Sequence, residues 1–187
     1  AVVSGLASKD KYPALKTLLT TEYHASPYME KYVLEALFCM EAPEEALDRI
    51  RKRYKTMVEY PGLTTLPENW IDETIQLKPG EPMINAFWGT YNHGWSGGPL
   101  TLLSQKVCGI EPTSPGFRTF RIRPQMGYLK QASCHVSSVS GEISVNIQRK
   151  GKKLQIDITV PSGTTAEVVF PSGKTKTLQS GTHSVRG

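Results

Sequence analysis

Residues 59–98 contain side chains suited to carbohydrate chemistry. Glu68 lies in the stretch TTLPENW, two positions before a tryptophan. The segment holds all three tryptophans of the chain: Trp70, Trp88 and Trp95. A carboxylate can act as a general acid or base, and flat indole faces can stack on the C–H faces of sugar rings. The residue types alone leave a solvated loop glutamate and buried core tryptophans as alternatives.

Other polar side chains of the same segment could take part. Asn92 and His93 are adjacent, and an amide or a neutral imidazole can hydrogen-bond a sugar hydroxyl. A histidine whose hydrogen bonds are satisfied within the fold is the alternative for His93. Three further carboxylates compete with Glu68 for a catalytic role: Asp72, Glu73 and Glu81. A loop of this length in a compact domain is functional or disordered, and its tryptophans argue against disorder.

The sequence on both sides of Glu68 has a helical period. Helices are predicted over four ranges: 12–23, 26–40, 43–60 and 98–108. Ser26 is the expected N-cap of the second helix, with Pro27 at its first position, where a missing N–H costs nothing. Gly109 is expected to end the fourth helix in a left-handed cap.

The period changes to two in the last third of the chain. Alternating apolar and polar residues predict strands over five ranges: 118–124, 132–139, 142–149, 153–160 and 166–170. Turn residues such as Ser140-Gly141 and Lys150-Gly151 separate them. This spacing predicts an antiparallel β-sandwich. We therefore divide the chain into helices over 1–112 and a sandwich over 113–187.

The basic excess of the chain lies in this second part. Residues 1–112 contain 11 lysines and arginines and 14 acidic residues, whereas residues 113–187 contain 11 and 3. The basic residues are scattered through strand-like segments without a nucleic-acid motif, so solvated strand faces are expected and a nucleic-acid partner is not. No run of 18 apolar residues occurs, which predicts no membrane span.

Neither a cofactor nor a compartment can be read from the cysteines. Cys39, Cys108 and Cys134 are far apart and have no metal-ligand spacing. We expect small buried hydrophobes there, and neither a metal nor another cofactor. The chain begins without Met in apolar sequence and shows no signal peptide, which we interpret as a piece of a longer or processed protein. A periplasmic or extracellular location is favoured over a cytoplasmic one.

An ordered series of stretches resembles the C-terminal end of bacterial α-L-rhamnosidases. The series is TTLPENW, then NHGWSGGPLTLLSQKVCGIEPTSPGFRTFRIRPQMG, then GEISVNIQRKGKKLQIDITVPSGTTAEVVFP. The helical run SPYMEKYVLEALFCMEAPEEALDRIRKRY is similar to the late helices of the family's catalytic barrel. The resemblance covers nearly the whole chain. It implies the terminal helices of an (α/α)6 barrel, followed by a C-terminal β-sandwich.

The resemblance also implies a reaction and roles for named residues. The family removes terminal α-L-rhamnose with inversion, using one carboxylic acid and one carboxylate base. Glu68 occupies the place of the base in a Thr-Thr/Met-aromatic-Glu-x-Trp pattern, although Pro67 stands where the family usually has Trp. Asn92 and His93 match a pair that lines the sugar site, and we expect Trp70, Trp88 and Trp95 to contribute substrate contacts.

The general acid of the family lies in earlier helices, so we expect it to be absent from this chain. The implied partners are a rhamnosyl glycoside and the N-terminal remainder of the parent enzyme. We therefore expect the 187 residues alone to be inactive. Two other readings stay open: a non-catalytic carbohydrate-binding module, and a structural module whose helices dock on a partner. Only the enzyme requires Glu68 to face a cleft together with His93 and a tryptophan.

Overall fold

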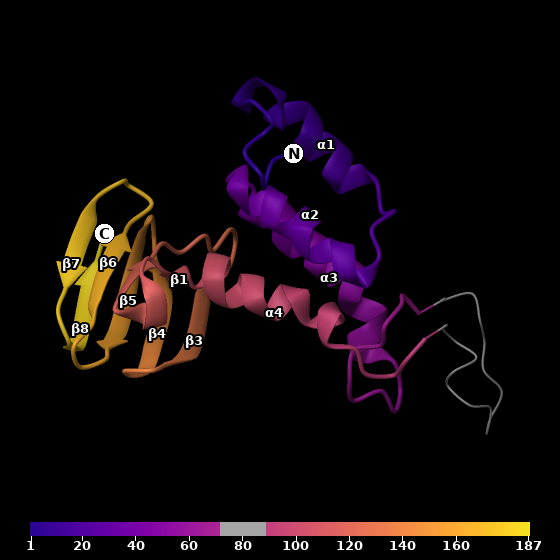
Figure 1. Cartoon of the computed structure of the whole chain (residues 1–187). Helices are drawn as coiled ribbons and strands as arrows, with labels where there is room; N and C mark the ends of the chain where they lie inside the picture. Colours follow the sequence, from indigo (N-terminus) through magenta and orange to yellow (C-terminus); the bar gives the residue numbers. More distant parts are fainter. Residues whose placement is uncertain (72–88) are drawn as a thin grey trace. The chain divides into compact units, whose positions relative to one another are not determined.

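The computed structural model describes residues 1–71 and 89–187 and divides the chain into two compact units (Figure 1). The first unit is Ala1–Leu102 and the second is Leu103–Gly187. The sequence-based division after residue 112 falls inside the second unit, because Ile110–Pro112 already forms a strand of one of its sheets.

The first unit is helical. Its elements are η1 (Lys9–Lys11), α1 (Tyr12–Thr21), α2 (Pro27–Cys39), α3 (Pro43–Glu59), η3 (Gly94–Gly97) and α4 (Gly98–Leu102). Proline stands in the first turn of α1, α2 and α3, as its fixed φ allows. The Ser26 hydroxyl accepts the Met29 N–H at 3.4 Å, so the predicted N-cap of α2 is present. No helix within the described residues is both long and apolar enough to cross a membrane.

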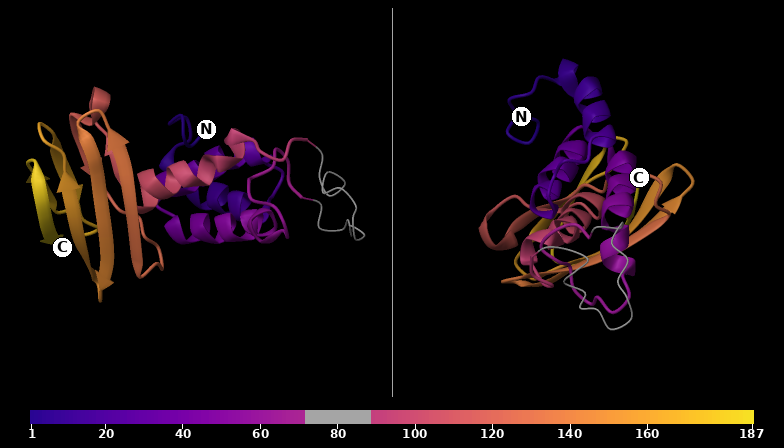
Figure 2. Two further views of the ribbon diagram at one scale, coloured as in Figure 1. Left: turned by 90° about the horizontal axis from the view of Figure 1, so that it is seen from below. Right: turned by 90° about the vertical axis from the view of Figure 1, so that its right-hand side faces the viewer.

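Helix α2 lies at the centre of this unit and packs against both α3 and α4 (Figures 1 and 2). Leu34, Leu37 and Phe38 of α2 are fully buried or nearly so. Helix α3 contributes Leu47 and Met57 to the interior. Leu37 and Phe38 follow Leu34 by three and four residues, which places the three side chains on one face of α2.

The helix predicted over 98–108 is observed as α4 in the first unit and as a π-helical turn, Leu103–Val107 (η4), in the second. Gly109 has φ +79°, the left-handed conformation that the sequence predicts. A Cβ at Gly109 would lie 2.2 Å from the carbonyl carbon of Arg123, so the backbone there has no room for a side chain.

The second unit is built from two four-stranded sheets. Their strands are β1 (Ile110–Pro112), β2 (Thr119–Ile122), β3 (Gln131–Ser138), β4 (Gly141–Lys150), β5 (Lys153–Val160), β6 (Thr165–Val169), β7 (Thr175–Leu178) and β8 (Gly181–Arg186). A 3₁₀ turn, Pro115–Phe117 (η5), lies between β1 and β2. One sheet has the order β1-β2-β6-β7 and the other β3-β4-β5-β8. The predicted fold class, helices followed by a β-sandwich, is confirmed.

One pairing differs from a purely antiparallel sandwich. Strands β2 and β6 run parallel, with Phe120 opposite Ala166 and Ile122 opposite Val168. The chain reaches this pairing only after completing β3, β4 and β5 in the other sheet, as a parallel pair requires a long connection. Apolar residues from both sheets form a single core, in which alternate positions of β4 and β5 are buried.

Candidate functional site

Glu68 lies in an irregular segment after α3 that pairs with the residues just before η3. The Glu68 N–H donates to the Thr90 carbonyl at 2.9 Å, and the His93 N–H donates to the Leu66 carbonyl at 2.9 Å. These backbone hydrogen bonds bring together two segments that are well separated in the sequence. The predicted base and the predicted sugar-binding histidine therefore belong to one local structure.

The carboxylate of Glu68 is half-buried and oriented by one residue. Its Oε2 accepts the backbone N–H of Thr90 at 3.0 Å and the Thr90 hydroxyl at 3.2 Å. Two fixed donors on one oxygen hold the carboxylate in a defined orientation while leaving it an acceptor. Sequence reasoning missed Thr90, because its partner is 22 residues away and no local pattern connects them.

Gly89 allows the backbone to approach this carboxylate closely. It has φ +116°, and a Cβ there would lie 2.9 Å from Glu68 Oε2 and 2.9 Å from Asn69 Nδ2. Only glycine adopts such a φ without strain. The sequence shows Gly89 as one of several glycines in this region and does not single it out.

His93 is ordered by Trp95. The two rings are stacked with centroids 3.8 Å apart and planes at 24°, and the backbone N–H of Trp95 donates to His93 Nδ1 at 3.4 Å. A neutral imidazole that accepts at Nδ1 carries its proton on Nε2, which is then the donor. Tyr28 of α2 lies beside Trp95, with ring centroids 5.3 Å apart.

Side chains of η3 also hold the backbone on both sides of Glu68. The indole N–H of Trp95 donates to the Glu68 carbonyl at 3.2 Å, and the buried Ser96 hydroxyl donates to the Pro67 carbonyl at 2.7 Å. The structure thus brings Glu68, His93 and Trp95 together. Asn92, the other member of the predicted pair, is exposed.

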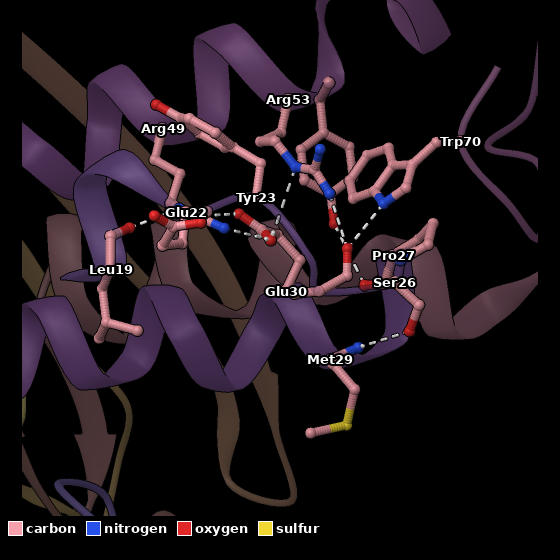
Figure 3. A network of polar contacts seen from close by, with 12 residues as sticks. Leu19, Glu22, Tyr23, Ser26, Pro27, Met29, Glu30, Arg49, Arg53 and Trp70 are labelled. Carbon is pink, nitrogen blue, oxygen red and sulfur yellow. Dashed lines mark hydrogen bonds and ion pairs between the residues drawn. The ribbon is translucent and has the colours of Figure 1, made fainter. Parts of the chain in front are cut away.

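Trp70 makes a different set of contacts. Its indole N–H donates to the Ala25 carbonyl at 2.8 Å, and its ring meets Tyr54 edge-on at 5.1 Å. The Arg53 guanidinium lies 4.1 Å from the Trp70 ring centroid (Figure 3). These contacts use its hydrogen-bond donor within the protein, so they favour a structural role over a sugar platform.

Trp70 also borders a cavity of about 490 Å³. Lysine, arginine and aromatic side chains dominate its wall: Tyr23, Lys52, Arg53, Lys55, Thr56, Met57, Trp70 and Ile71. Lys52 lies 4.1 Å from the Tyr23 ring centroid and Arg53 covers Trp70, so cations already occupy the aromatic faces here. The cavity therefore offers less flat aromatic surface than uncovered Tyr23 and Trp70 rings would provide.

Four predicted candidates lie outside the described residues: Trp88, Asp72, Glu73 and Glu81. In the described ranges, 1–71 and 89–187, no group of three or more histidine, cysteine, aspartate or glutamate side chains could hold a metal ion.

Comparison with known proteins shows which proteins this chain is similar to. Residues 109–185 match the bacterial alpha-L-rhamnosidase C-terminal domain. An alpha-L-rhamnosidase of Streptomyces avermitilis is 32% identical over 114 residues, which are 59% of this chain and 10% of that protein. The chain is similar to the C-terminal part of α-L-rhamnosidases. An alpha-L-rhamnosidase of Formosa agariphila is 26% identical over 119 residues, 63% of this chain and 12% of that protein.

Solved rhamnosidase structures share the fold over both units. The alpha-L-rhamnosidase of Aspergillus terreus matches with a TM-score of 0.77 and 21% identity, over 97% of this chain and 22% of its own. The rhamnosidase of Bacillus sp. GL1 matches with a TM-score of 0.74 and 25% identity, over 92% and 18%. The resemblance predicted from the sequence is confirmed, and the chain spans about a tenth of the length of the curated rhamnosidases it matches.

Proposed function

We propose that this chain is part of an inverting α-L-rhamnosidase and that Glu68 is its general base. The observation that supports this role is the orientation of the Glu68 carboxylate by Thr90, in a residue whose backbone carbonyl is bonded by Trp95, the ring that stacks on His93. The similarity to α-L-rhamnosidases supports rhamnosides as the proposed substrate class. The activity and the substrate of the full-length enzyme are part of this proposal.

An inverting glycosidase needs a base and an acid on opposite faces of the sugar ring, about 6.5–9.5 Å apart. Glu68 removes a proton from the water that attacks the anomeric carbon. As the new C–O bond forms, the glycosidic C–O bond breaks and the acid protonates the departing oxygen. We propose that this acid lies outside residues 1–187, so the chain alone hydrolyses no rhamnoside above background.

His93 fits the task of binding a rhamnose hydroxyl. Its Nδ1 accepts the backbone N–H of Trp95, which leaves Nε2–H as the donor for a sugar oxygen. The stacking of Trp95 on the imidazole keeps the ring in one plane. Asn92 is exposed and can add an amide contact from the neighbouring position.

The test is steady-state kinetics of the full-length enzyme on an aryl α-L-rhamnoside. Glu68→Gln keeps the shape of the side chain but cannot accept the proton of water. Loss of a general base costs about 10²–10⁴-fold in rate, so kcat falls by that factor while KM changes little. The matched control is Glu142→Gln, an exposed carboxylate of β4, which leaves kcat unchanged.

His93→Ala provides a second arm, because loss of a substrate contact raises KM as well as lowering kcat. Circular dichroism checks that each variant is folded. A folded Glu68→Gln enzyme within about threefold of the wild-type kcat is incompatible with a general base at Glu68.

A further inference from the structure

Two arginines of α3 converge on one buried glutamate of α2 (Figure 3). Arg49 donates to both carboxylate oxygens of Glu30, from Nε to Oε1 and from Nη2 to Oε2 at 3.1 Å. The Arg53 Nε lies 3.7 Å from Glu30 Oε2. Glu30 has no exposed surface and the Arg49 side chain is 3% exposed. Such a cluster has one negative and two positive charges, so the remaining donors must find other acceptors.

Those acceptors are carbonyls at the end of α1 and in the connection to α2. Arg49 Nη1 donates to the carbonyls of Leu19 and Glu22, the latter at 2.8 Å. Arg53 Nη2 donates to the Ala25 carbonyl at 2.6 Å. The last carbonyls of a helix have no partner within it, and cations are favourable at this end. The two arginines thereby fix the connection to α2 on α3.

Ala25 joins this network to Trp70. Its carbonyl accepts both Arg53 Nη2 and the indole N–H of Trp70, the latter at 2.8 Å. The Arg53 guanidinium covers the Trp70 ring, and Tyr54 meets that ring edge-on. Burial lowers the pKa of Arg53, and the neighbouring Glu30 opposes this, so the guanidinium stays charged. Trp70 is consequently fixed both by its hydrogen bond to Ala25 and by the packing of Arg53 and Tyr54 against its ring.

Trp70 stands two residues after Glu68 in the chain. The preceding side of Glu68 is held by Ser96, which donates to the Pro67 carbonyl, and its carboxylate is held by Thr90. On the following side, the Glu68 carbonyl accepts the indole N–H of Trp95, and Trp70 anchors the chain two residues after Glu68. A shift of Trp70 would therefore act on the Glu68 backbone through the single intervening residue, against the hydrogen bond from Trp95.

We propose that Arg53 is a positioning residue, which acts through the Ala25 carbonyl and Trp70 to hold Glu68 in its reactive place. This inference rests on the function proposed above for Glu68. It gives Trp70 a role in the geometry of the base instead of a contact with sugar. A buried ion cluster alone is weak grounds for stability, whereas a network that ends beside a reacting group has a specific consequence for rate.

The test is a double-mutant cycle in the full-length enzyme, with kcat and KM measured on an aryl α-L-rhamnoside. Arg53→Lys keeps the charge but loses the planar group that covers Trp70 and reaches Ala25. Trp70→Phe keeps an aromatic ring but removes the indole N–H together with the five-membered ring that carries it. This second variant keeps the inference testable if Arg53→Lys fails to fold. Each is made in the wild-type background and in Glu68→Gln. Arg51→Lys, the same change at an exposed position of α3, is the matched control.

A misplaced reacting group costs about 10–10²-fold in rate. Arg53→Lys and Trp70→Phe are expected to lower kcat by that factor with KM within about twofold, whereas Arg51→Lys is silent. In the Glu68→Gln background the same changes are expected to cost less than about twofold, because residues that act through one group are not additive.

Three results would overturn the inference. One is an unchanged kcat in both single variants. Another is an equal loss in both backgrounds, which means that the network affects the enzyme independently of Glu68. A rise in KM with constant kcat would assign Trp70 to substrate binding instead. The Glu68→Gln single variant is read separately, so failure of the proposed base is distinguished from failure of the network.

Discussion

The two units fill their interiors in different ways. In the described part of the chain, the buried charged side chains are Glu30 and Arg49, and both belong to the helical unit. The β unit buries a continuous set of apolar side chains from both sheets, with Thr164 as its buried polar residue. A core of alternating apolar residues specifies the β unit, whereas polar contacts with defined partners complete the helical one.

The two units also differ in how many large apolar side chains they expose to solvent. Within the described residues, the helical unit exposes these large apolar side chains: Val3, Leu6, Leu18, Tyr28, Met29, Tyr32, Val58, Tyr91, Trp95 and Leu100. The β unit exposes fewer among the described residues, namely Tyr128 and Val139. The candidate site is built on the unit that contains the buried ion cluster. We infer that the β unit is the more self-contained of the two.

The largest effect is expected at the buried glutamate of the helical unit. Glu30→Gln leaves the buried Arg49 and the half-buried Arg53 without a carboxylate, and breaking such a cluster costs about 3–5 kcal/mol of unfolding free energy. Glu35→Gln, on a more accessible face of α2, should cost about 0–1 kcal/mol. Urea unfolding followed by helical circular dichroism measures both. A cost below about 1 kcal/mol for Glu30→Gln would show that the helical unit does not depend on this network.

Much of the fold could be predicted from periodicity, and the misses have a physical cause. Strand β4 was predicted over 142–149 and is observed as Gly141–Lys150, because its buried positions alternate without interruption. Strands β7 and β8 were missed, because each places few apolar residues in the core, such as Leu178 and Val185. A period of two cannot be recognised in a strand that has only one or two apolar residues. The parallel β2–β6 pair depends on contacts between distant segments, which a local pattern does not contain.

The candidate site was only partly accessible to sequence reasoning. Glu68 and His93 came from the resemblance to rhamnosidases, and the structure brings their segments together. Thr90 and Gly89 were missed because their contacts with Glu68 are long-range. Glu30 did have a signal. It stands four and seven residues before the buried Leu34 and Leu37, so a charge occupies the apolar face of α2.

A smaller effect is expected where the backbone approaches the carboxylate. Gly89→Ala places a methyl group 2.9 Å from Glu68 Oε2 and strains a residue with φ +116°. We expect kcat of the full-length enzyme to fall about 10–10²-fold through displacement of Glu68. Gly97→Ala is the matched control, since a Cβ there meets nothing within 4 Å. Equal activity of the two variants would mean that the Glu68 carboxylate tolerates the displacement.

A modest effect is expected in the apolar core of the β unit. Ile147 is fully buried, and Ile147→Val removes one methylene, which typically costs about 0.5–1.5 kcal/mol. Val139→Ala, at a side chain that is 87% exposed, should stay within about 0.5 kcal/mol of wild type. Thermal unfolding followed in the strand region of the circular dichroism spectrum measures both. A larger loss at Val139 than at Ile147 would place the stabilising contacts of this unit outside its core.

The smallest effect on stability is expected from the ionisation of a cysteine. The cysteines also provide the clearest contrast between the two units. Cys39 of α2 is exposed, whereas burial raises the pKa of Cys108 in the β unit to about 12, with Cys134 adding to the shift. The thiolate is the reactive form, and at pH 8 a thiol with that pKa is ionised to only about one part in 10⁴.

Iodoacetamide at pH 8 should therefore label Cys39 first and leave Cys108 unmodified until the β unit unfolds. Peptide mass spectrometry of the two sites over time measures this order. Because the folded pKa of Cys108 exceeds its unfolded value, this thiol contributes stability that is complete below about pH 8.5. That contribution declines as the pH rises towards 12. Labelling of Cys108 as fast as Cys39 in the folded protein would show that the β core opens locally, and would reverse the inference that it is the more self-contained unit.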